Sequence, residues 1–450
     1  MTMFGWYVGV AATLLAVLVY LAYFFKFNWV KDLRKDSKKQ KVSGIYMTSK
    51  NRKIGKVPPV YPNGWFALLE SSQLNKGEVR HVSALGENFA VFRTEKGVVN
   101  ILDAYCPHLG ANMAEGGRVK GDCLECPFHS WTFRGKDGFC ENIPYAEKVP
   151  HIARAKAWKC CEVNHLIFVW YHAESAEPDW QPQPHTHLSN GAWRFQGRNE
   201  FLISCHIQDI AENGADFAHL GAVHGPTIFL SNYVPWLARH SWTNAIWRPH
   251  CSYSNDLDAE AKVETTAEVC VKVNDSASMQ PIANGNNNNN HHHHNHLSSL
   301  TAENDSNTRK EKHKAGLQMH HSLVLLDRFT VLELDVRVEQ IGPGYVELQI
   351  STFFGPMYIL QTVTPLEPLL QRVTHLIYAP PLLAPFTNLV FLGECLQFER
   401  DVAIWNHKQF ERQPILVRED RAILAYRRWY SQFYSANSPT YQTAMKTLQW

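Results

Sequence analysis

Two short motifs constrain this chain most, because each offers one thiolate and one imidazole as metal ligands. They are Cys106-Pro107-His108 and Cys126-Pro127-Phe128-His129, and residues 109–125 lie between them. A [2Fe–2S] cluster of the Rieske type requires this set, with two Cys on one iron and two His on the other. The spacing therefore predicts paired loops that hold such a cluster, joined by a hairpin turn at the intervening glycines. The expected ligands are Cys106, His108, Cys126 and His129.

A structural zinc site is the alternative interpretation of the same region. Cys123-x-x-Cys126 also has the spacing of zinc ligands. That site leaves Cys106 and His108 without a role, and one CxxC motif arises by chance far more often than a CxH paired with a CxxH. The cluster is therefore favoured, and four unrelated core residues are the least favoured reading.

A second metal site is indicated by His219 and His224. Positions five apart on a straight α-helix differ by about 140°, so both imidazoles reach one metal only if the helix is interrupted. We expect a break at Gly221, with Gly225-Pro226 ending the helix. Two His and one distant carboxylate form the facial triad of non-haem Fe(II) oxygenases, which leaves positions open for O₂. Two core His in an apolar helix are the alternative.

The composition is that of a folded protein in a reducing compartment. The 450 residues, 45% hydrophobic and 19% charged, allow two or three domains. A net charge of +2 gives no reason to expect nucleic acid. Ten Cys are too few and too scattered for a disulfide scaffold.

The chain opens with an uncharged apolar segment, Met3 to Phe25. As a helix it is long enough to cross a hydrocarbon core of about 30 Å. A cleaved signal peptide would instead have a basic start, a shorter apolar run and a cleavage site of small residues. Basic residues follow the segment, and the positive-inside rule places them in the cytosol. We expect a single-pass protein of the endoplasmic reticulum with its catalytic body in the cytosol.

The remaining pattern predicts an α+β fold with a membrane helix, a small all-β domain, and a helix-grip-like antiparallel sheet wrapped around helices. Residues 281–315, rich in Asn, His and charges, should be a disordered insertion. The expected helices run from Gly393 to about Arg412 and from Ile415 to Tyr434. The expected divisions are a transmembrane anchor (1–25), a basic tether (26–57), the cluster domain (58–175), a Pro-rich linker (176–190), the iron domain (191–435) and a C-terminal tail (436–450).

The two sites, in this order, resemble the Rieske non-haem iron oxygenases over roughly residues 60–435. In that family an Asp three residues before the first iron-binding His bonds to a cluster His, and Asp216 occupies this place. The family's third iron ligand is an Asp close before a Trp, which matches Asp401 before Trp405. Ser130 departs from the family's usual Gly, where we expect a small hydroxyl to fit. Four other acids stay open as the third ligand: Asp327, Asp335, Glu394 and Glu399.

The N-terminal segment and the ending Arg428-Trp429-Tyr430-x-x-Phe433-Tyr434 resemble the steroid-directed branch, most closely the Neverland-type cholesterol 7-desaturases. The resemblance implies a sterol substrate, O₂, one [2Fe–2S] cluster and one mononuclear Fe(II). It also implies NAD(P)H electrons from a flavin-containing reductase, with or without a ferredoxin, and a homotrimer in which Asp216 links neighbouring subunits. The expected reaction forms the C7–C8 double bond of 7-dehydrocholesterol in steroid hormone synthesis.

Three alternatives remain open. Hydroxylation of a steroid ring starts from the same hydrogen abstraction, and the sequence does not separate it from desaturation. The fold also suits oxygenation of another bulky apolar ring substrate. A membrane-bound Rieske electron-transfer protein is the non-enzymatic alternative, for which the second metal motif would be surplus.

Overall fold

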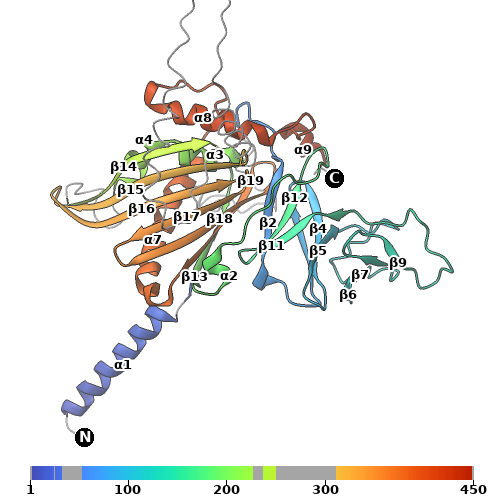
Figure 1. Cartoon of the computed structure of the whole chain (residues 1–450), viewed down its shortest axis with the longest axis horizontal. Helices are drawn as coiled ribbons and strands as arrows, with labels where there is room; N and C mark the ends of the chain where they lie inside the picture. The colour runs from blue at the N-terminus through green and yellow to red at the C-terminus, as the bar shows by residue number, and fades with distance from the viewer. Residues whose placement is uncertain (1–2, 25, 33–52, 227–236, 250–310, 448–450) are drawn as a thin grey trace, which may run out of the picture.

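The computed structural model describes residues 3–24, 26–32, 53–226, 237–249 and 311–447. It has the expected α+β architecture, in which a small all-β domain lies beside one large sheet that curves around a long helix (Figure 1). The β domain is built from short strands. Continuous apolar runs explain them, since β12 (Leu166–Tyr171) is buried at every position.

Three small sheets make up the β domain. The first joins β2 (Gly64–Glu70), β11 (Cys160–Val163) and β12. The second contains β3 (Val79–Ala84), β4 (Glu87–Arg93), β5 (Val99–Asp103) and β10 (Ala157–Trp158), and η3 (Ser71–Gln73) precedes it. The third carries the two motif loops and contains β6 (Arg118–Lys120), β7 (Cys123–Glu125), β8 (Thr132–Arg134) and β9 (Cys140–Asn142). The β6–β7 hairpin turns at Gly121, whose φ of 59° suits glycine.

The second sheet has eight strands in the order β1-β13-β19-β18-β17-β16-β15-β14. All neighbours are antiparallel except β1, which runs parallel to β13. Helix α7 (Ala384–Trp405) packs its buried Phe391 and Cys395 against one face, in a core with Leu334, Val336 and Ile350. The strand bounds are β1 (Phe27–Asp32), β13 (Arg194–Ile203), β14 (Ala238–Pro249), β15 (Lys314–Leu325), β16 (Phe329–Ile341), β17 (Tyr345–Thr352), β18 (Gly355–Glu367) and β19 (Leu370–Ala379).

The helices differ from their expected bounds at identifiable residues. Helix α7 begins nine residues before the expected Gly393, with Pro385 in its first turn, where a missing N–H costs nothing. The expected helix Ile415–Tyr434 is divided into η7 (Arg418–Asp420), α8 (Arg421–Tyr430) and η8 (Ser431–Phe433). The other helices are α2 (Thr186–Ser189), α3 (Ile207–Glu212), η4 (Asn213–Ala215), α4 (Phe217–His219), η5 (Leu220–His224), η6 (Pro381–Leu383) and α9 (Tyr441–Thr447).

Three expected segments contain a strand or pack on the body. Within the expected tether, Phe27–Asp32 forms strand β1 and pairs with β13, while residues 33–52 lie outside the described part of the chain. The expected insertion ends early, because β15 starts at Lys314, and residues 281–310 lie outside the description. The expected tail packs on the body, where Ala444 is buried and the Pro439 carbonyl accepts from the Val60 N–H at 2.9 Å.

The N-terminal segment forms a helix, α1 (Met3–Tyr23), that projects from the body (Figure 1). Its described side chains are exposed, among them Leu14 and Leu15. Across the parts of the chain that the structure describes, no helix meets the combined length and apolar character of a membrane span. The structure therefore does not bear out the expected membrane helix, which stays a prediction from the sequence.

Candidate metal centres

The segment that carries His219 and His224 does not break at Gly221, so the expected helix break is wrong. Helix α4 continues directly into η5, which is a π-helix. In a π-helix each residue bonds to the fifth residue along, so positions five apart lie above one another, unlike in an α-helix. The π-turn therefore solves the five-residue spacing, and the two imidazole rings lie 5.1 Å apart between centroids.

Asp401 of α7 completes a three-residue cluster with these histidines. One ligand atom from each of His219, His224 and Asp401 lies within 4.8 Å of the others. The Nε2 atom of His224 is 3.1 Å from Oδ2 of Asp401, and both side chains are about nine-tenths buried. Two imidazoles and one carboxylate around a single point are the donor set of a facial-triad iron site.

Hydrogen bonds at the outer ring nitrogens aim both imidazoles at this point. Nδ1 of His219 bonds to the backbone carbonyl of Asp216, and Nδ1 of His224 bonds to Oε1 of Gln397 at 3.1 Å. Because both carbonyl oxygens only accept, each ring carries its proton on Nδ1 and keeps a lone pair on Nε2. This is the tautomer that a metal-binding His needs. The residues present therefore fit a mononuclear iron.

Gln397 and Arg400 are residues that the sequence analysis missed. Both lie on α7 in the turn before Asp401, and Gln397 stands four residues from it, on the same helical face. Gln397 also donates to the His224 carbonyl at 3.3 Å. Arg400 donates to the carbonyls of Val223 at 3.0 Å and Pro226 at 2.6 Å. The sequence held one signal for Gln397, because it lies four residues before the candidate ligand Asp401.

Gln397→Ala should weaken iron binding by about 10- to 100-fold, the usual effect of losing a partner that orients a metal ligand. Titrating Fe(II) into the metal-free protein measures this directly. Leu389→Ala, an exposed site on the same helix, is the matched control. Unchanged iron affinity in Gln397→Ala would show that His224 is oriented without it.

The four other acids considered for the third ligand have partners elsewhere. Asp327 pairs with Arg239 and Asp335 with His320, each at 2.8 Å. Glu394 accepts from Asn199 at 3.0 Å. Glu399 pairs with Lys31 of β1 at 2.6 Å. The geometry therefore favours Asp401 as the third ligand.

Asp216 caps the start of α4. Its Oδ1 accepts from the His219 N–H at 3.2 Å, so it holds the ligand's backbone as well as its ring. About a third of its side chain is exposed. The carboxylate is thus accessible for a further hydrogen bond at the surface beside the candidate iron site.

The two motif loops have matching backbones. The backbone carbonyl of Cys106 accepts from the N–H of Gly110 at 2.9 Å. The backbone carbonyl of Cys126 likewise accepts from the N–H of Ser130 at 3.1 Å. Gly110 and Ser130 both adopt positive φ, 75° and 59°. Ser130 therefore stands where the backbone favours glycine, and its position in a left-handed conformation is strained.

Ser130→Gly should stabilise the β domain by about 1 kcal/mol, because removing Cβ strain outweighs the added freedom of the unfolded chain. The midpoint of thermal bleaching of the cluster absorbance measures the effect. Ser130→Ala keeps the strain and removes only the hydroxyl, so it should not stabilise. A lower midpoint in Ser130→Gly would mean that the hydroxyl matters more than the strain.

The four motif residues converge in the structure. The rings of His108 and His129 lie 4.8 Å apart, and the thiols of Cys106 and Cys126 are hydrogen-bonded neighbours. Burial raises the pKa of the Cys106 thiol to about 11, so it binds as a thiolate only beside a strong positive charge. Nδ1 of His108 is buried and has no hydrogen-bond partner among the residues that the structure describes. An orphaned ring nitrogen beside two buried thiols fits a [2Fe–2S] cluster.

Cys123, the alternative zinc ligand, has another partner. Its thiol donates to Oε2 of Glu141 at 2.9 Å, and burial raises its pKa to about 12. The ring of Trp131 stacks on the ring of His108, with 4.5 Å between their centroids. The alternative zinc site is therefore not favoured by the geometry.

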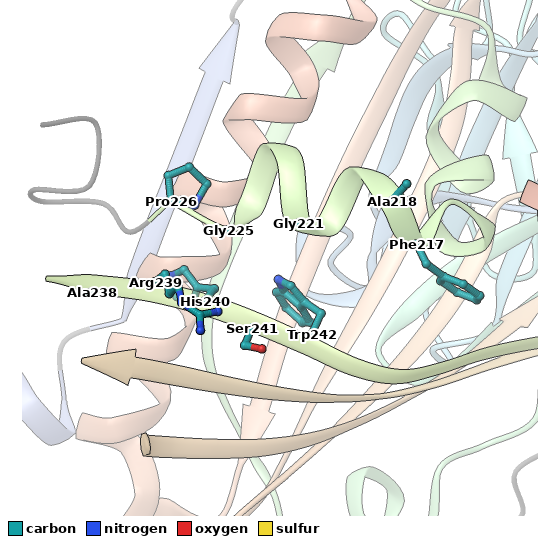
Figure 2. Close-up of a pocket in the computed structure, with 10 residues that line it drawn as sticks. All are labelled: Phe217, Ala218, Gly221, Gly225, Pro226, Ala238, Arg239, His240, Ser241 and Trp242. Carbon is teal, nitrogen blue, oxygen red and sulfur yellow. The ribbon is translucent and has the colours of Figure 1, made fainter. Parts of the chain in front are cut away.

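A cavity of about 600 Å³ lies against the candidate iron site. Phe217 and Gly221 of the α4–η5 segment form one side, and His240 and Trp242 of β14 form another (Figure 2). A cavity of this size takes a drug-sized or ring-system ligand. A ligand in it would contact Ala218 and Gly225, the chain neighbours of His219 and His224.

Comparison with known proteins agrees with the two sites. Residues 64–153 match the Rieske [2Fe-2S] domain, and residues 169–434 match the 3-ketosteroid 9alpha-hydroxylase C-terminal domain. The chain is 38% identical to cholesterol 7-desaturase nvd of Drosophila melanogaster, over 95% of this chain and 91% of the relative. It is 39% identical to the Xenopus laevis protein of that name, over 90% of this chain and 78% of the relative.

A solved structure, dicamba monooxygenase bound to 3,6-dichlorosalicylic acid, shares the fold with a TM-score of 0.54 at 13% identity. The match covers 83% of this chain and 97% of that one. A Rieske domain followed by a catalytic domain of this kind defines a Rieske oxygenase, an enzyme that carries a [2Fe–2S] cluster and a mononuclear iron. Within this class, the chain belongs to the family of the cholesterol 7-desaturases.

Proposed function

We propose that this Rieske oxygenase acts on a sterol and converts cholesterol to 7-dehydrocholesterol in steroid hormone synthesis. The observation that carries the proposal is the cluster of His219, His224 and Asp401 beside a cavity of about 600 Å³. The relatives named cholesterol 7-desaturase supply the substrate. In the balanced reaction, the sterol loses two hydrogens, and NAD(P)H with one proton supplies two more. One O₂ accepts all four hydrogens and is reduced to two waters.

Each site residue has an assigned role in this proposal. Cys106, His108, Cys126 and His129 hold the cluster, and His219, His224 and Asp401 hold the iron. When bound, the cluster supplies electrons and the iron activates O₂. The Asp216 carbonyl accepts from Nδ1 of His219, and Oε1 of Gln397 accepts from Nδ1 of His224. These bonds fix the orientation of the two imidazoles. The cavity beside this segment would receive the ring system of the substrate.

Steroid-ring hydroxylation is the second candidate, favoured by the match to the 3-ketosteroid 9alpha-hydroxylase C-terminal domain. Both reactions begin with hydrogen abstraction and differ in whether oxygen or a second hydrogen is then transferred. An electron-transfer protein without catalysis would need only the β domain. The buried triad in the second domain argues against that role.

Turnover with cholesterol tests the proposal. Purified protein is incubated with cholesterol in detergent, O₂, NADPH and a flavin-dependent Rieske reductase, and the sterols are separated by gas chromatography with mass spectrometry. The proposal expects 7-dehydrocholesterol. A hydroxylated sterol would support the second candidate, and no product from an iron-replete protein would contradict both.

We further propose that the protein works as a head-to-tail homotrimer in which electrons pass between subunits. Such rings close by placing one surface against a different surface of the next copy. Leu109 and Phe128, beside the two cluster His, are more than half exposed and provide an apolar contact surface. The exposed Asp216 carboxylate is the expected acceptor for a cluster His of the neighbouring subunit.

Asp216→Asn should retain both metals but slow reoxidation of the reduced cluster by O₂ and substrate. Stopped-flow absorbance measures the rate, and Asp327→Asn, an exposed acid in an ion pair on the second domain, is the control. Wild-type reoxidation in Asp216→Asn, or an active monomer in sedimentation, would refute the intersubunit path.

Membrane attachment is a separate proposal that rests on the sequence. The segment from Met3 to Phe25 has no charged residue and is followed by a basic flank. We propose a single-pass anchor in the endoplasmic reticulum with the catalytic body in the cytosol. Protease added to intact microsomes should digest the body. Complete protection without detergent, or release of the protein by alkaline carbonate, would contradict this placement.

A further inference from the structure

A pair of histidines interrupts the apolar face of the sheet beside the candidate iron site. His240 and Trp242 lie on β14 and line the cavity. His321 of β15 stands directly opposite Trp242. Directly opposed residues of antiparallel strands share a face, as do residues two apart on one strand. The three side chains therefore project from the same face of the sheet.

Beside the pair, the next strands present apolar side chains on that face. His321 also stands directly opposite Leu334 of β16, and Leu334 and Val336 belong to the core under α7. Leu332 and Met319 pack against the same core. The histidine pair thus places a polar group next to the apolar side chains under α7.

The pair is hydrogen-bonded internally but leaves hydrogen-bonding atoms unused. Nδ1 of His240 lies 2.8 Å from Nε2 of His321. Within the described part of the chain, Nδ1 of His321, a residue only 4% exposed, has no hydrogen-bond partner, and neither has the buried Nε1 of Trp242. Unmade hydrogen bonds of buried polar groups are rare in folded proteins and call for a ligand or water.

Both imidazoles are neutral at physiological pH. Burial lowers the pKa of His240 to about 4, helped by the positive charge of Arg400, and lowers the pKa of His321 to about 3. Two neutral rings that share one hydrogen bond have two tautomeric arrangements. In one, Nε2 of His240 is a donor, and in the other it is an acceptor. The ring thus suits a hydroxyl, which both donates and accepts.

The backbone fixes the pair relative to the iron ligands. The His240 N–H donates to the carbonyl of Gly225 at 2.8 Å, and Gly225 directly follows His224. The adjacent Arg239 pairs with Pro226 in an isolated antiparallel β-bridge. The wall that carries His240 is therefore tied to the segment that carries the candidate ligands, and a group bound by His240 has a defined position relative to them.

We propose that His240, oriented by His321, is a positioning residue that hydrogen-bonds the oxygen substituent of the ring substrate. The inference rests on the proposed function, since cholesterol carries a single hydroxyl on an apolar ring system. Binding that hydroxyl sets which carbon faces the iron. The ligand class is a hydroxylated polycyclic hydrocarbon.

Equilibrium binding of two matched sterols tests the inference. Cholesterol and cholest-5-ene, which lacks the hydroxyl, are titrated into the iron- and cluster-replete protein in detergent. Wild type should prefer cholesterol by about tenfold, as expected for one hydrogen bond. His240→Phe should bring the two affinities together, and His240→Gln, which keeps a donor and an acceptor, should restore part of the preference.

Two control variants separate this role from its alternatives. His320→Asn alters the neighbouring His, which pairs with Asp335 at 2.8 Å on the other face of β15, and should keep the preference. Trp242→Phe removes the rival donor Nε1 and should also keep it. Iron content and the cluster spectrum establish that each variant is folded.

The outcomes are distinct. A tenfold preference that survives in His240→Phe, or that is lost in Trp242→Phe instead, overturns the inference. Equal binding of both sterols by wild type also overturns it and leaves the proposed function standing. Failure of wild type to bind either sterol contradicts the proposed function itself.

Discussion

Asp401→Ala is expected to abolish turnover and lose one iron per chain while the cluster spectrum stays unchanged. Asp401 supplies the only carboxylate in the described part of the chain that lies within 4.8 Å of ligand atoms from both His219 and His224. Without it, two neutral imidazoles remain, and the Fe(II) ion loses the one charged ligand of its facial triad. Iron analysis together with electron paramagnetic resonance of the reduced protein measures both centres in one sample.

Glu399→Ala is the matched control, because it removes a carboxylate from the same helix. Glu399 pairs with Lys31 and accepts from Trp29 at 2.8 Å, so its loss should weaken the packing of β1 and leave iron content unchanged. Full activity in Asp401→Ala would move the third ligand to another acid. Loss of iron in Glu399→Ala alone would identify that acid.

Cys126→Ser is expected to eliminate the Rieske signal, whereas Cys123→Ser should keep it. The thiol of Cys126 neighbours that of Cys106, while the thiol of Cys123 donates to Glu141. Serine replaces a soft thiolate by a hydroxyl that is protonated at neutral pH, which removes one cluster ligand. Cys123→Ser keeps a donor for Glu141 at nearly the same place.

The reduced electron paramagnetic resonance spectrum and the count of acid-labile sulfide measure the result. If Cys123→Ser eliminates the signal and Cys126→Ser keeps it, the cluster assignment is wrong. Bound zinc in the purified protein with no labile sulfide would favour the alternative zinc site instead.

Much of this architecture was predictable from the sequence because it depends on local patterns. Strands β2, β4 and β12 are continuous apolar runs, and β16 alternates, so their periods identify them. The two motif loops were predictable because their ligand types and spacing are rare. Strands β13, β14 and β15 were missed because they mix charged, polar and aromatic residues and owe their pairing to neighbours far along the chain.

The candidate iron site was predictable in its residues but not in its backbone. The five-residue spacing of His219 and His224 suggested a broken helix, since positions five apart on an α-helix point about 140° apart. The structure uses a π-turn, whose cost is offset by contacts from α7 that no local pattern reveals. His240 and His321 were missed for a similar reason, because β14 and β15 lie on either side of a long intervening segment.

The most direct test of the central claim is a single turnover without a reductase. The protein is reduced chemically under anaerobic conditions, freed of reductant and mixed with O₂ in the presence or absence of cholesterol. Absorbance of the cluster and the sterol products are then measured together. The account predicts that cholesterol accelerates cluster reoxidation and that 7-dehydrocholesterol forms in proportion to the iron-loaded sites. Reoxidation at the same rate without cholesterol, with no modified sterol in either sample, would contradict it.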